Sequence, residues 1–302
     1  MRITVVLNPR LRNGKEGSPL ASVLEEKFGR SLAGIKVAAD PGHASDIARE
    51  AAEEGVDTVV VAGGDGSING VLDGLLGTGT ALGIISSGTA NDLATFYHIP
   101  REVPQACDVI LERRLQRADV IAVNGHHYVT TGGLGLPARV AEMANEVKRR
   151  DAMSKGLRDL LGSRLYIFAT LYALMRGDLA SHWLTIQANG SCFSSNPLGL
   201  LITNLPFVAR HFRIAPGAAN NDGAFDVCLI EKSPNRLRDL ATMLQLLAGR
   251  PVRSPFLKTW RAQELVITSQ NPLTFFGDGE VLQKERIFRV RVHPNALNVV
   301  VP

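Results

Sequence analysis

The chain has 302 residues, of which 45% are hydrophobic and 21% charged, and its formal net charge is +4. This composition is typical of a globular protein, and the length predicts two domains or one large domain. The longest apolar run, at 165–175, is well short of the roughly 20 residues that a membrane-spanning helix needs. The mild basic excess favours anionic substrates or membrane surfaces, while the lack of interleaved aromatic and basic residues argues against a nucleic-acid partner.

The start of the chain and its cysteines predict where the protein works. The sequence "MRITVVLNPR" enters an expected strand almost at once, which leaves no room for a signal peptide. Cys107, Cys192 and Cys228 are far apart and odd in number, which argues against disulfides and metal knuckles. We therefore expect a cytoplasmic protein, peripheral at the inner membrane face, and the sequence leaves a homodimer open.

The first part of the chain alternates strand and helix patterns. Strands are expected at 2–9, 35–40, 57–64 and 81–88, and helices at 19–29, 43–55, 67–76 and 89–99. Thr89 or Asn91 is the expected cap of the last of these helices. This βαβ rhythm with short connections predicts a parallel sheet with right-handed crossovers. We assign an α/β nucleotide-binding domain to residues 1–120.

The pattern changes near residue 118, after which most expected strands are antiparallel or form hairpins. Asn189-Gly190 is a strong hairpin signal between two short strands. Helices are expected at about 136–177 and 236–247. The sequence therefore predicts a second, β-rich domain over 121–302, with a last strand that is a candidate to return to the first domain.

The stretch "VVVAGGDGSING", residues 59–70, carries the first functional signal. Its apolar, β-branched start predicts a strand buried on both faces, and its glycines lie between that strand and a helix, where open α/β sheets bind ligands. Glycine lets the backbone approach a phosphate, and helix amides favour an anion. Asp65 is unusual there, because a phosphate repels a nearby carboxylate. The repulsion is avoided only when the carboxylate holds a metal, orders a water or takes a proton. We predict phosphate chemistry at this turn.

Three glycine-rich turns contain acidic residues, at 63–67, 88–92 and 277–280. A calcium loop starting at Asp65 is excluded, because its twelfth position is Leu76, which cannot supply a bidentate carboxylate. The G-x-G-x-x-A pattern at 133–138 is a weak dinucleotide signal, since a proline interrupts it. Arg12 and Lys15 are candidate phosphate contacts without the spacing of a phosphate loop.

The segment at 146–177 carries seven basic residues around an apolar stretch. It predicts a core helix with a solvated basic face. The alternative is a face that docks on an anionic bilayer.

Taken together, these motifs resemble the diacylglycerol kinase catalytic superfamily, and most closely its soluble bacterial lipid kinases of the YegS/BmrU-like family. The resemblance covers essentially the whole chain through "GGDGSIN", "GTANDLA", "TTGGLG", "LYIFATLYALMRGD", "APGAANNDGAFDV" and "FGDGEVL", in that order. It implies an NAD kinase/diacylglycerol kinase-like fold, with an N-terminal α/β domain and a C-terminal β-rich sandwich domain. It also implies transfer of the γ-phosphoryl group of ATP to a hydroxyl of a membrane lipid, with Mg²⁺.

The resemblance also implies roles for particular residues. Those expected to bind the nucleotide are Gly63, Gly64, Asp65, Gly66, Ser67, Ile68, Asn69, Gly70, Thr89, Asn91 and Asp92. Asp278 would be the general base that takes the proton from the lipid hydroxyl, with Glu280 beside it and Asp65 as a third catalytic carboxylate. A structural magnesium ion would be held by Asp222 with main-chain oxygens near Ala219 and Ala224, and a second ion would arrive with ATP.

Two departures from the family pattern leave alternatives open. Gly70 replaces a frequent glutamate, and Ala38 stands where a nucleotide-contacting threonine is often found. A catalytically silent nucleotide-binding regulator is therefore one alternative. The other is an NAD kinase-like enzyme, which shares the glycine turn but phosphorylates a soluble ribose.

Overall fold

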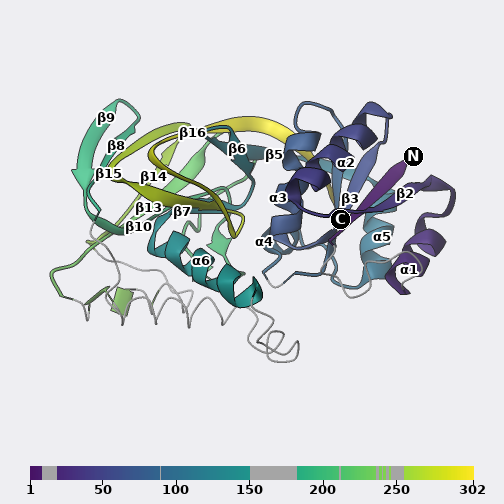
Figure 1. The fold of residues 1–302 in the computed structure, drawn as a ribbon, viewed down its shortest axis with the longest axis horizontal. Coiled ribbons are helices and arrows are strands. Elements are labelled where there is room, and N and C mark those ends of the chain that lie inside the picture. The colour runs from purple at the N-terminus through teal and green to yellow at the C-terminus, as the bar shows by residue number, and fades with distance from the viewer. Residues whose placement is uncertain are drawn as a thin grey trace. The chain divides into compact units, whose positions relative to one another are not determined.

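The computed structural model describes residues 1–8, 19–88, 90–149, 182–210, 212–235, 238–239, 241–242, 245 and 255–302. The chain forms two compact units, Met1–Val120 with Pro294–Pro302, and Ile121–His293. The predicted fold class is confirmed, because the first unit has a parallel sheet between helices and the second consists mainly of strands (Figure 1).

The first unit is built on a parallel sheet in the order β2-β1-β3-β4-β16. Its strands are β1 (Ile3–Leu7), β2 (Leu32–Val37), β3 (Thr58–Gly63), β4 (Ala81–Ser86) and the end of β16 (Glu280–Val301). Every residue of β3 is buried, as the continuous β-branched run predicts for a strand covered on both faces.

Helices cover this sheet in two pairs. The unit contains α1 (Pro19–Phe28), the short 3₁₀ helix η1 (Gly29–Ser31), α2 (Pro41–Glu53), α3 (Asp65–Leu75), α4 (Asp92–Phe96) and α5 (Val103–Glu112). Helix α2 packs against α3, and α1 packs against α5 (Figure 1). Right-handed crossovers place the two pairs on opposite faces of the sheet.

Three predicted helix starts differ from the structure: α3 begins at Asp65 instead of residue 67, and two others differ for identifiable reasons. Helix α2 begins at Pro41 instead of residue 43, because Asp40 caps it by accepting a 2.9 Å hydrogen bond from the backbone amide of His43. Helix α4 is shorter than the predicted 89–99. Its N-cap residue is Asn91, which was one of the two predicted candidates. After the helix ends, the backbone of His98 is left-handed, with a φ of 56°.

Glycines set the close contact between α2 and α3. A Cβ atom at Gly74 would lie 2.2 Å from the carbonyl oxygen of Ser45 and 2.9 Å from the Cβ of Ala48. One turn earlier, a Cβ at Gly70 would lie 3.4 Å from that of Ala44. Gly70 therefore faces α2, but a Cβ atom there would make only an ordinary van der Waals contact, unlike one at Gly74.

We expect Gly74→Ala to lower the free energy of unfolding by about 1–3 kcal/mol, because the new methyl group cannot fit without moving a backbone segment. Urea denaturation measures the change. Gly34→Ala is the matched control, since nothing lies within 4 Å of a Cβ placed there. Equal losses in both variants would contradict the packing explanation.

The second unit is an antiparallel β-structure. Its main sheet runs β14-β13-β10-β7-β15-β16, with β8 and β9 joined to β15, and β5 and β6 joined to β16. The strands are β5 (Arg114–Val123), which starts in the first unit, β6 (His126–Tyr128), β7 (Thr131–Gly135), β8 (Leu184–Ala188), β9 (Ser191–Ser195), β10 (Pro197–Thr203), β11 (Phe207–Val208), β12 (Phe212–Arg213), β13 (Phe225–Glu231), β14 (Leu257–Ala262), β15 (Glu264–Gly277) and β16. The predicted Asn189-Gly190 hairpin is confirmed: it joins β8 to β9, and both residues have positive φ.

Helix α6 (Leu136–Arg149) packs on this sheet through its first turns. Leu136, Ala138 and Ala141 contact a buried cluster that includes Leu201 and Cys228 of β10 and β13. The rest of the predicted helix at 136–177, including most of its basic residues, lies outside the described residues, and so does most of the predicted helix at 236–247.

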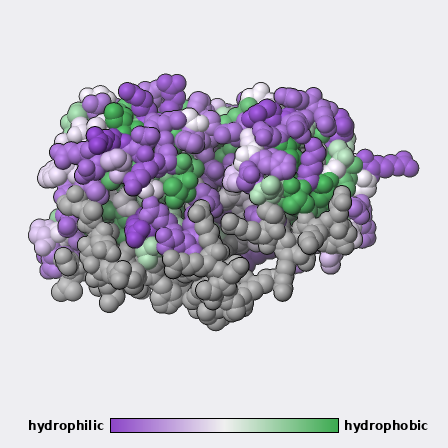
Figure 2. All heavy atoms as spheres, in the orientation of Figure 1, coloured by the Kyte–Doolittle hydropathy of each residue, from purple (hydrophilic) through white to green (hydrophobic). Residues whose placement is uncertain are grey.

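The surface in view is mainly hydrophilic where the structure describes it, with apolar residues scattered among polar ones (Figure 2). The large apolar side chains exposed in the described residues are Met1, Val37, Leu111, Leu115, Trp183, Val281 and Ile287. Among the described helices, none combines the length and the apolar character needed to cross a bilayer.

Candidate active-site residues

The first candidate site lies at the carboxyl ends of β1 and β3. These strands are neighbours, and the chain leaves them toward opposite edges of the sheet, so they form the switch point where open α/β sheets bind ligands. Asn8 follows β1, and Gly64 and Asp65 follow β3. The Asn8 side-chain amide donates a 2.6 Å hydrogen bond to Ser67 Oγ, which ties the two strand ends together.

The glycines of this site are needed for contact between two turns. A Cβ at Gly64 would lie 2.9 Å from the Cα of Gly88, and a Cβ at Gly88 would lie 2.5 Å from the Cα of Gly64. A Cβ at Gly63 would lie 2.4 Å from Ser67 Oγ. Gly64 is also the N-cap residue of α3 and supplies no side-chain cap, while its carbonyl oxygen accepts from the backbone amides of Ser67 and Ile68.

Asp65 joins these two turns through its carboxylate. Oδ1 accepts a hydrogen bond of 3.3 Å from the backbone amide of Leu93, at the start of α4. Removal from solvent raises the pKa of the Asp65 carboxyl, and amides of this helix start, including that of Asp92, lower it in part. The backbone amides at the start of α4 are therefore the partners of the Asp65 carboxylate, and these contacts involve no phosphate or metal.

The loop before α4 is shaped by its own asparagine. Asn91 has a left-handed backbone with φ of 51°, and its side chain accepts a hydrogen bond from the Gly88 amide at 3.0 Å and donates one to the Gly88 carbonyl at 2.9 Å. It makes no side-chain cap of α4, so Asp65 supplies that acceptor instead.

The predicted nucleotide residues are only partly gathered at this edge. Gly63, Gly64, Asp65, Ser67, Asn91 and Asp92 lie in the two turns and the helix starts that follow them. Ile68 is buried in the core and Gly70 faces α2, so only their backbones are available to a ligand. Thr89, Arg12 and Lys15 lie outside the described residues.

In the second unit, Asp278 lies at the turn between β15 and β16 and is 5% exposed. Its Oδ1 accepts hydrogen bonds from the Thr130 backbone amide at 2.8 Å and from Thr130 Oγ1 at 2.6 Å, and its Oδ2 accepts one from the Val129 amide at 3.1 Å. Its own amide donates to the carbonyl of Thr131 at 3.0 Å. These donors fix the carboxylate and stabilise its negative charge.

Glycines also permit the close contact between β7 and the end of β15. A Cβ at Gly132 would lie 2.7 Å from the Phe276 carbonyl oxygen and from the ring of Tyr128, and a Cβ at Gly277 would lie 2.9 Å from the Cβ of Tyr128. The "TTGG" motif therefore brings β7 against the strand that carries Asp278. Burial, together with the charge of Asp278, raises the pKa of the Tyr128 phenol well above its usual value.

A residue that the sequence did not single out holds the same turn from α6. The Asn145 side chain donates to the Gly279 carbonyl at 3.1 Å and to the Glu280 carboxylate at 3.2 Å. The Glu280 side chain is thus held by Asn145. Thr130 belongs to the "TTGGLG" motif but was given no role, and Asn145 lies in no motif; the partners of both are more than 130 residues away in the sequence.

The carboxylate of the predicted structural metal site is engaged by protein groups in this structure. Asp222 is paired with the Arg261 guanidinium, and its other oxygen accepts a hydrogen bond from the Ala224 amide at 3.2 Å. Burial raises the pKa of nearby Asp226, Asp222 adds to this rise, and Arg261 opposes it. Among the described residues, no group of three or more His, Cys, Asp or Glu side chains is placed to hold a metal. The guanidinium of Arg261 therefore occupies the carboxylate that Asp222 would offer to a cation beside the suggested main-chain ligands at Ala219 and Ala224.

Comparison with known proteins gives the class to which these features belong. The family profile described as "Diacylglycerol kinase catalytic domain" matches residues 2–123. A second profile, "YegS C-terminal NAD kinase beta sandwich-like domain", matches residues 130–301. Both belong to the lipid kinases that carry a diacylglycerol kinase catalytic domain. The chain is a member of that family, in its YegS-like branch, as the motifs predicted.

Individual relatives agree with this assignment. A protein of Alcanivorax borkumensis named "Probable lipid kinase YegS-like" is 29% identical over 284 residues, which cover 91% of this chain and 88% of the relative. The "Diacylglycerol kinase" of Bacillus subtilis is 28% identical over 242 residues, with 79% and 76% covered. A crystal structure from Bacillus anthracis str. Sterne has a TM-score of 0.78 at 19% identity and covers 100% of this chain and 95% of that one, which shows the shared fold.

We expect Mg²⁺ to raise the melting temperature of Arg261→Gln, without nucleotide, more than that of the wild type. The substitution removes the guanidinium that offsets the repulsion between the carboxylates of Asp222 and Asp226. Mg²⁺ can then bind beside these carboxylates and stabilise the fold. Thermal unfolding with Mg²⁺ and with a chelator measures the difference. Arg291→Gln, which breaks an exposed pair with Glu264, is the control. A magnesium effect of equal size in the wild type would restore the predicted metal site.

Proposed function

We propose that the protein transfers the γ-phosphoryl group of ATP to a hydroxyl group of a diacylglycerol-like lipid. The observation that carries this proposal is the buried Asp278 carboxylate, fixed by the Val129 amide and by the amide and hydroxyl of Thr130, in a member of a lipid kinase family. A general base must be ionised and held in one orientation before it can take a proton from an acceptor hydroxyl.

The first unit is assigned to the nucleotide phosphates. Its switch point combines Asn8 and Ser67 with the first turn of α3, which has no side-chain cap. Backbone amides of this kind bind anionic oxygens. Asp65 acts there by holding the two turns in contact, since its carboxylate already accepts from the start of α4.

The proposed step is an in-line displacement. The lipid hydroxyl gives its proton to Asp278, and its oxygen forms a bond to the γ-phosphorus while the bond from that phosphorus to the bridging oxygen breaks and ADP leaves. We assign the proton to Oδ2, because Oδ1 carries both hydrogen bonds from Thr130. Asn145 and Glu280 keep the turn in place. Magnesium bound with ATP supplies neutralisation of the phosphate charge, and no step uses a metal at Asp222.

The lipid acceptor sets where the reaction takes place. Diacylglycerol-like lipids stay in the bilayer, so we propose that the protein works peripherally at the inner membrane face. Its net charge of +4 favours approach to anionic lipid surfaces.

We expect the wild type to transfer labelled γ-phosphate from ATP to a lipid in mixed micelles, and Asp278→Asn to be slower by about 10²-fold or more, which is the usual contribution of a positioned base. A panel of diacylglycerols, monoacylglycerols and sphingoid lipids defines the acceptor. Glu264→Gln, at an exposed carboxylate of the same unit, is the control and should keep full activity.

The same assay separates the alternatives. With NAD as a soluble acceptor, label in NADP and none in lipid would identify an NAD kinase-like enzyme. Binding of ATP without transfer to any acceptor would indicate a nucleotide-binding regulator. Full lipid kinase activity in Asp278→Asn would overturn the assignment of the base while leaving the reaction intact.

A further inference from the structure

The segment that holds Asp278 is itself held by the end of β10. Thr203, the last residue of β10, lies opposite Thr131 in the antiparallel pairing of β10 with β7. Both side chains are buried, and their hydroxyl oxygens are 2.8 Å apart. The backbone amide of Asn204 donates to the Thr130 carbonyl at 2.9 Å. Thr130 is therefore bound to Asp278 on one side and to the end of β10 on the other.

The Thr203 hydroxyl lies at the centre of these contacts. Its oxygen accepts a hydrogen bond from the Leu205 amide at 3.0 Å, and it lies 2.9 Å from the Leu205 carbonyl oxygen and 3.3 Å from that of Thr130. A hydroxyl group has one proton and two lone pairs. Because the two carbonyls can only accept, they take the Thr203 proton, and the Thr131 hydroxyl donates to Thr203 Oγ1. The proton and both lone pairs of this hydroxyl are therefore used within the protein.

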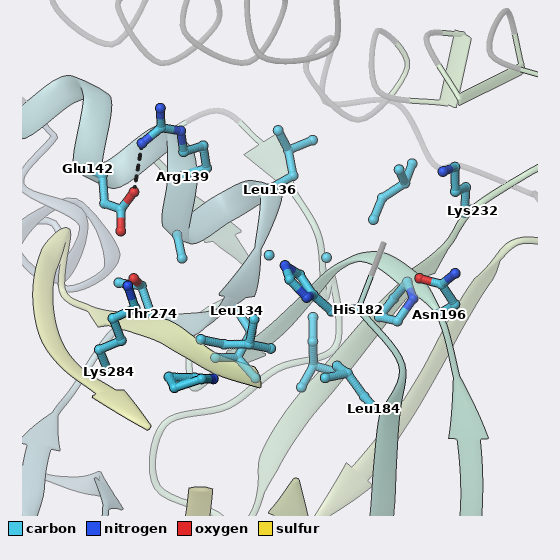
Figure 3. A pocket seen from close by; sticks show the side chains of 18 residues that line it. Leu134, Leu136, Arg139, Glu142, His182, Leu184, Asn196, Lys232, Thr274 and Lys284 are labelled. Atoms are coloured by element: carbon cyan, nitrogen blue, oxygen red, sulfur yellow. Dashed lines mark hydrogen bonds and ion pairs between the residues drawn. The ribbon is translucent and has the colours of Figure 1, made fainter. Parts of the chain in front are cut away.

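This hydroxyl network is separate from the cavity at the other end of β7. That cavity has a volume of about 250 Å³, and Leu134, Leu136 and Thr274 are among the residues that line it (Figure 3). Thr131 and Thr203 do not line it, and both are buried from solvent. The network therefore acts on the arrangement of the protein itself and not on a ligand in this cavity.

We propose that Thr203 is a positioning residue for the general base, because its hydroxyl keeps Thr130 directed at Asp278 Oδ1 and so leaves Oδ2 to take the proton. The inference rests on the proposed function, in which Asp278 is the base. A valine at position 203 would leave the Thr131 hydroxyl and the Leu205 amide without this partner in a buried place, and the segment would shift to recover hydrogen bonds. The amide and hydroxyl of Thr130 belong to that segment, so the carboxylate would lose its alignment.

Transfer of labelled γ-phosphate by Thr203→Val and Thr203→Ser tests this role. We expect Thr203→Val to lower kcat about tenfold with little change in KM for ATP and lipid, since a misplacement of about 1 Å costs a catalytic group up to roughly 10²-fold. Thr203→Ser keeps the hydroxyl and should stay within about twofold of the wild type.

Thr80→Val is the matched control for the loss of a buried hydroxyl. Thr80 is a buried threonine of the first unit, and its hydroxyl donates to the Val56 carbonyl at 3.1 Å. This variant should be less stable than the wild type and keep its kcat.

The pH dependence separates lost alignment from lost folded protein. Hydrogen bonds to a carboxylate favour its charged form, so weaker donation from Thr130 should move the acidic limb of kcat/KM to higher pH in Thr203→Val, by about half a unit or more. A smaller folded fraction would lower the whole profile without moving it. Tyr128 and Glu280, the titratable side chains nearest in sequence to the two ends of this contact, are the same in every variant.

Melting temperatures give a second measurement that needs neither ATP nor an acceptor. The wild type, Thr203→Val, Asp278→Asn and the double variant form a double-mutant cycle. We expect Thr203→Val to lower the melting temperature by about 2 °C less in the Asp278→Asn background, because the aligned donors then have no carboxylate charge to stabilise. Thr80→Val combined with Asp278→Asn should be additive.

Three results would each overturn the inference. Equal losses of kcat in Thr203→Ser and Thr203→Val would mean that the hydroxyl does not carry the effect. An acidic limb that stays in place would make Thr203 purely structural, and so would additive melting temperatures. Failure of the proposed function gives a different pattern, since the wild type would then transfer no phosphate to any lipid. Non-additive melting temperatures in that case would keep Thr203 as the residue that orients Asp278 and remove only the kinase reaction.

Discussion

Close contact between backbone segments, permitted by glycine, is the constraint on which both candidate sites depend. In the first unit, Gly64 and Gly88 let two turns touch, and the Asp65 carboxylate then reaches the amides of α4. In the second unit, Gly132 and Gly277 let β7 and β15 approach, and the Asp278 carboxylate reaches Thr130. In both places a carboxylate is held by neighbouring backbone, which fixes it without long side chains and their conformational entropy.

The sequence was sufficient for features that depend on local pattern. Continuous β-branched runs give buried parallel strands, Asn-Gly gives the hairpin of β8 and β9, and the acidic glycine turns lie at strand ends. It was insufficient where the partner is distant along the chain. Asn145 reaches the Glu280 turn from a helix, and Arg261 reaches Asp222 from another strand, and neither residue belongs to a motif. The prediction also placed the start of α2 two residues too late, because it did not recognise Asp40 as the N-cap and Pro41 as the first helical residue.

The departures from the family pattern have different physical meanings once their surroundings are known. Gly70 faces α2, and a Cβ atom there would touch Ala44 and Pro41 at ordinary contact distance, so helix packing by itself does not explain the missing glutamate. The Asp222–Arg261 pair is different, because a guanidinium and a divalent cation compete for the same oxygens. Arginine is permanently charged and needs no supply of metal, but it binds through a planar fork and cannot gather carbonyl ligands from several directions as a cation does.

Strand β16 has a consequence for how the protein can be divided. It begins at the turn of Asp278 and ends beside β4, where Asn298 and Val299 pair with Ala81 and Leu82. A fragment that stops after Val120 would lack this strand and would leave the edge of β4 open to pairing with other chains, a recognised cause of aggregation. Expression of the nucleotide unit by itself therefore calls for a graft of Pro294–Pro302 and not for simple truncation, and any gene fusion or permutation must respect this shared strand.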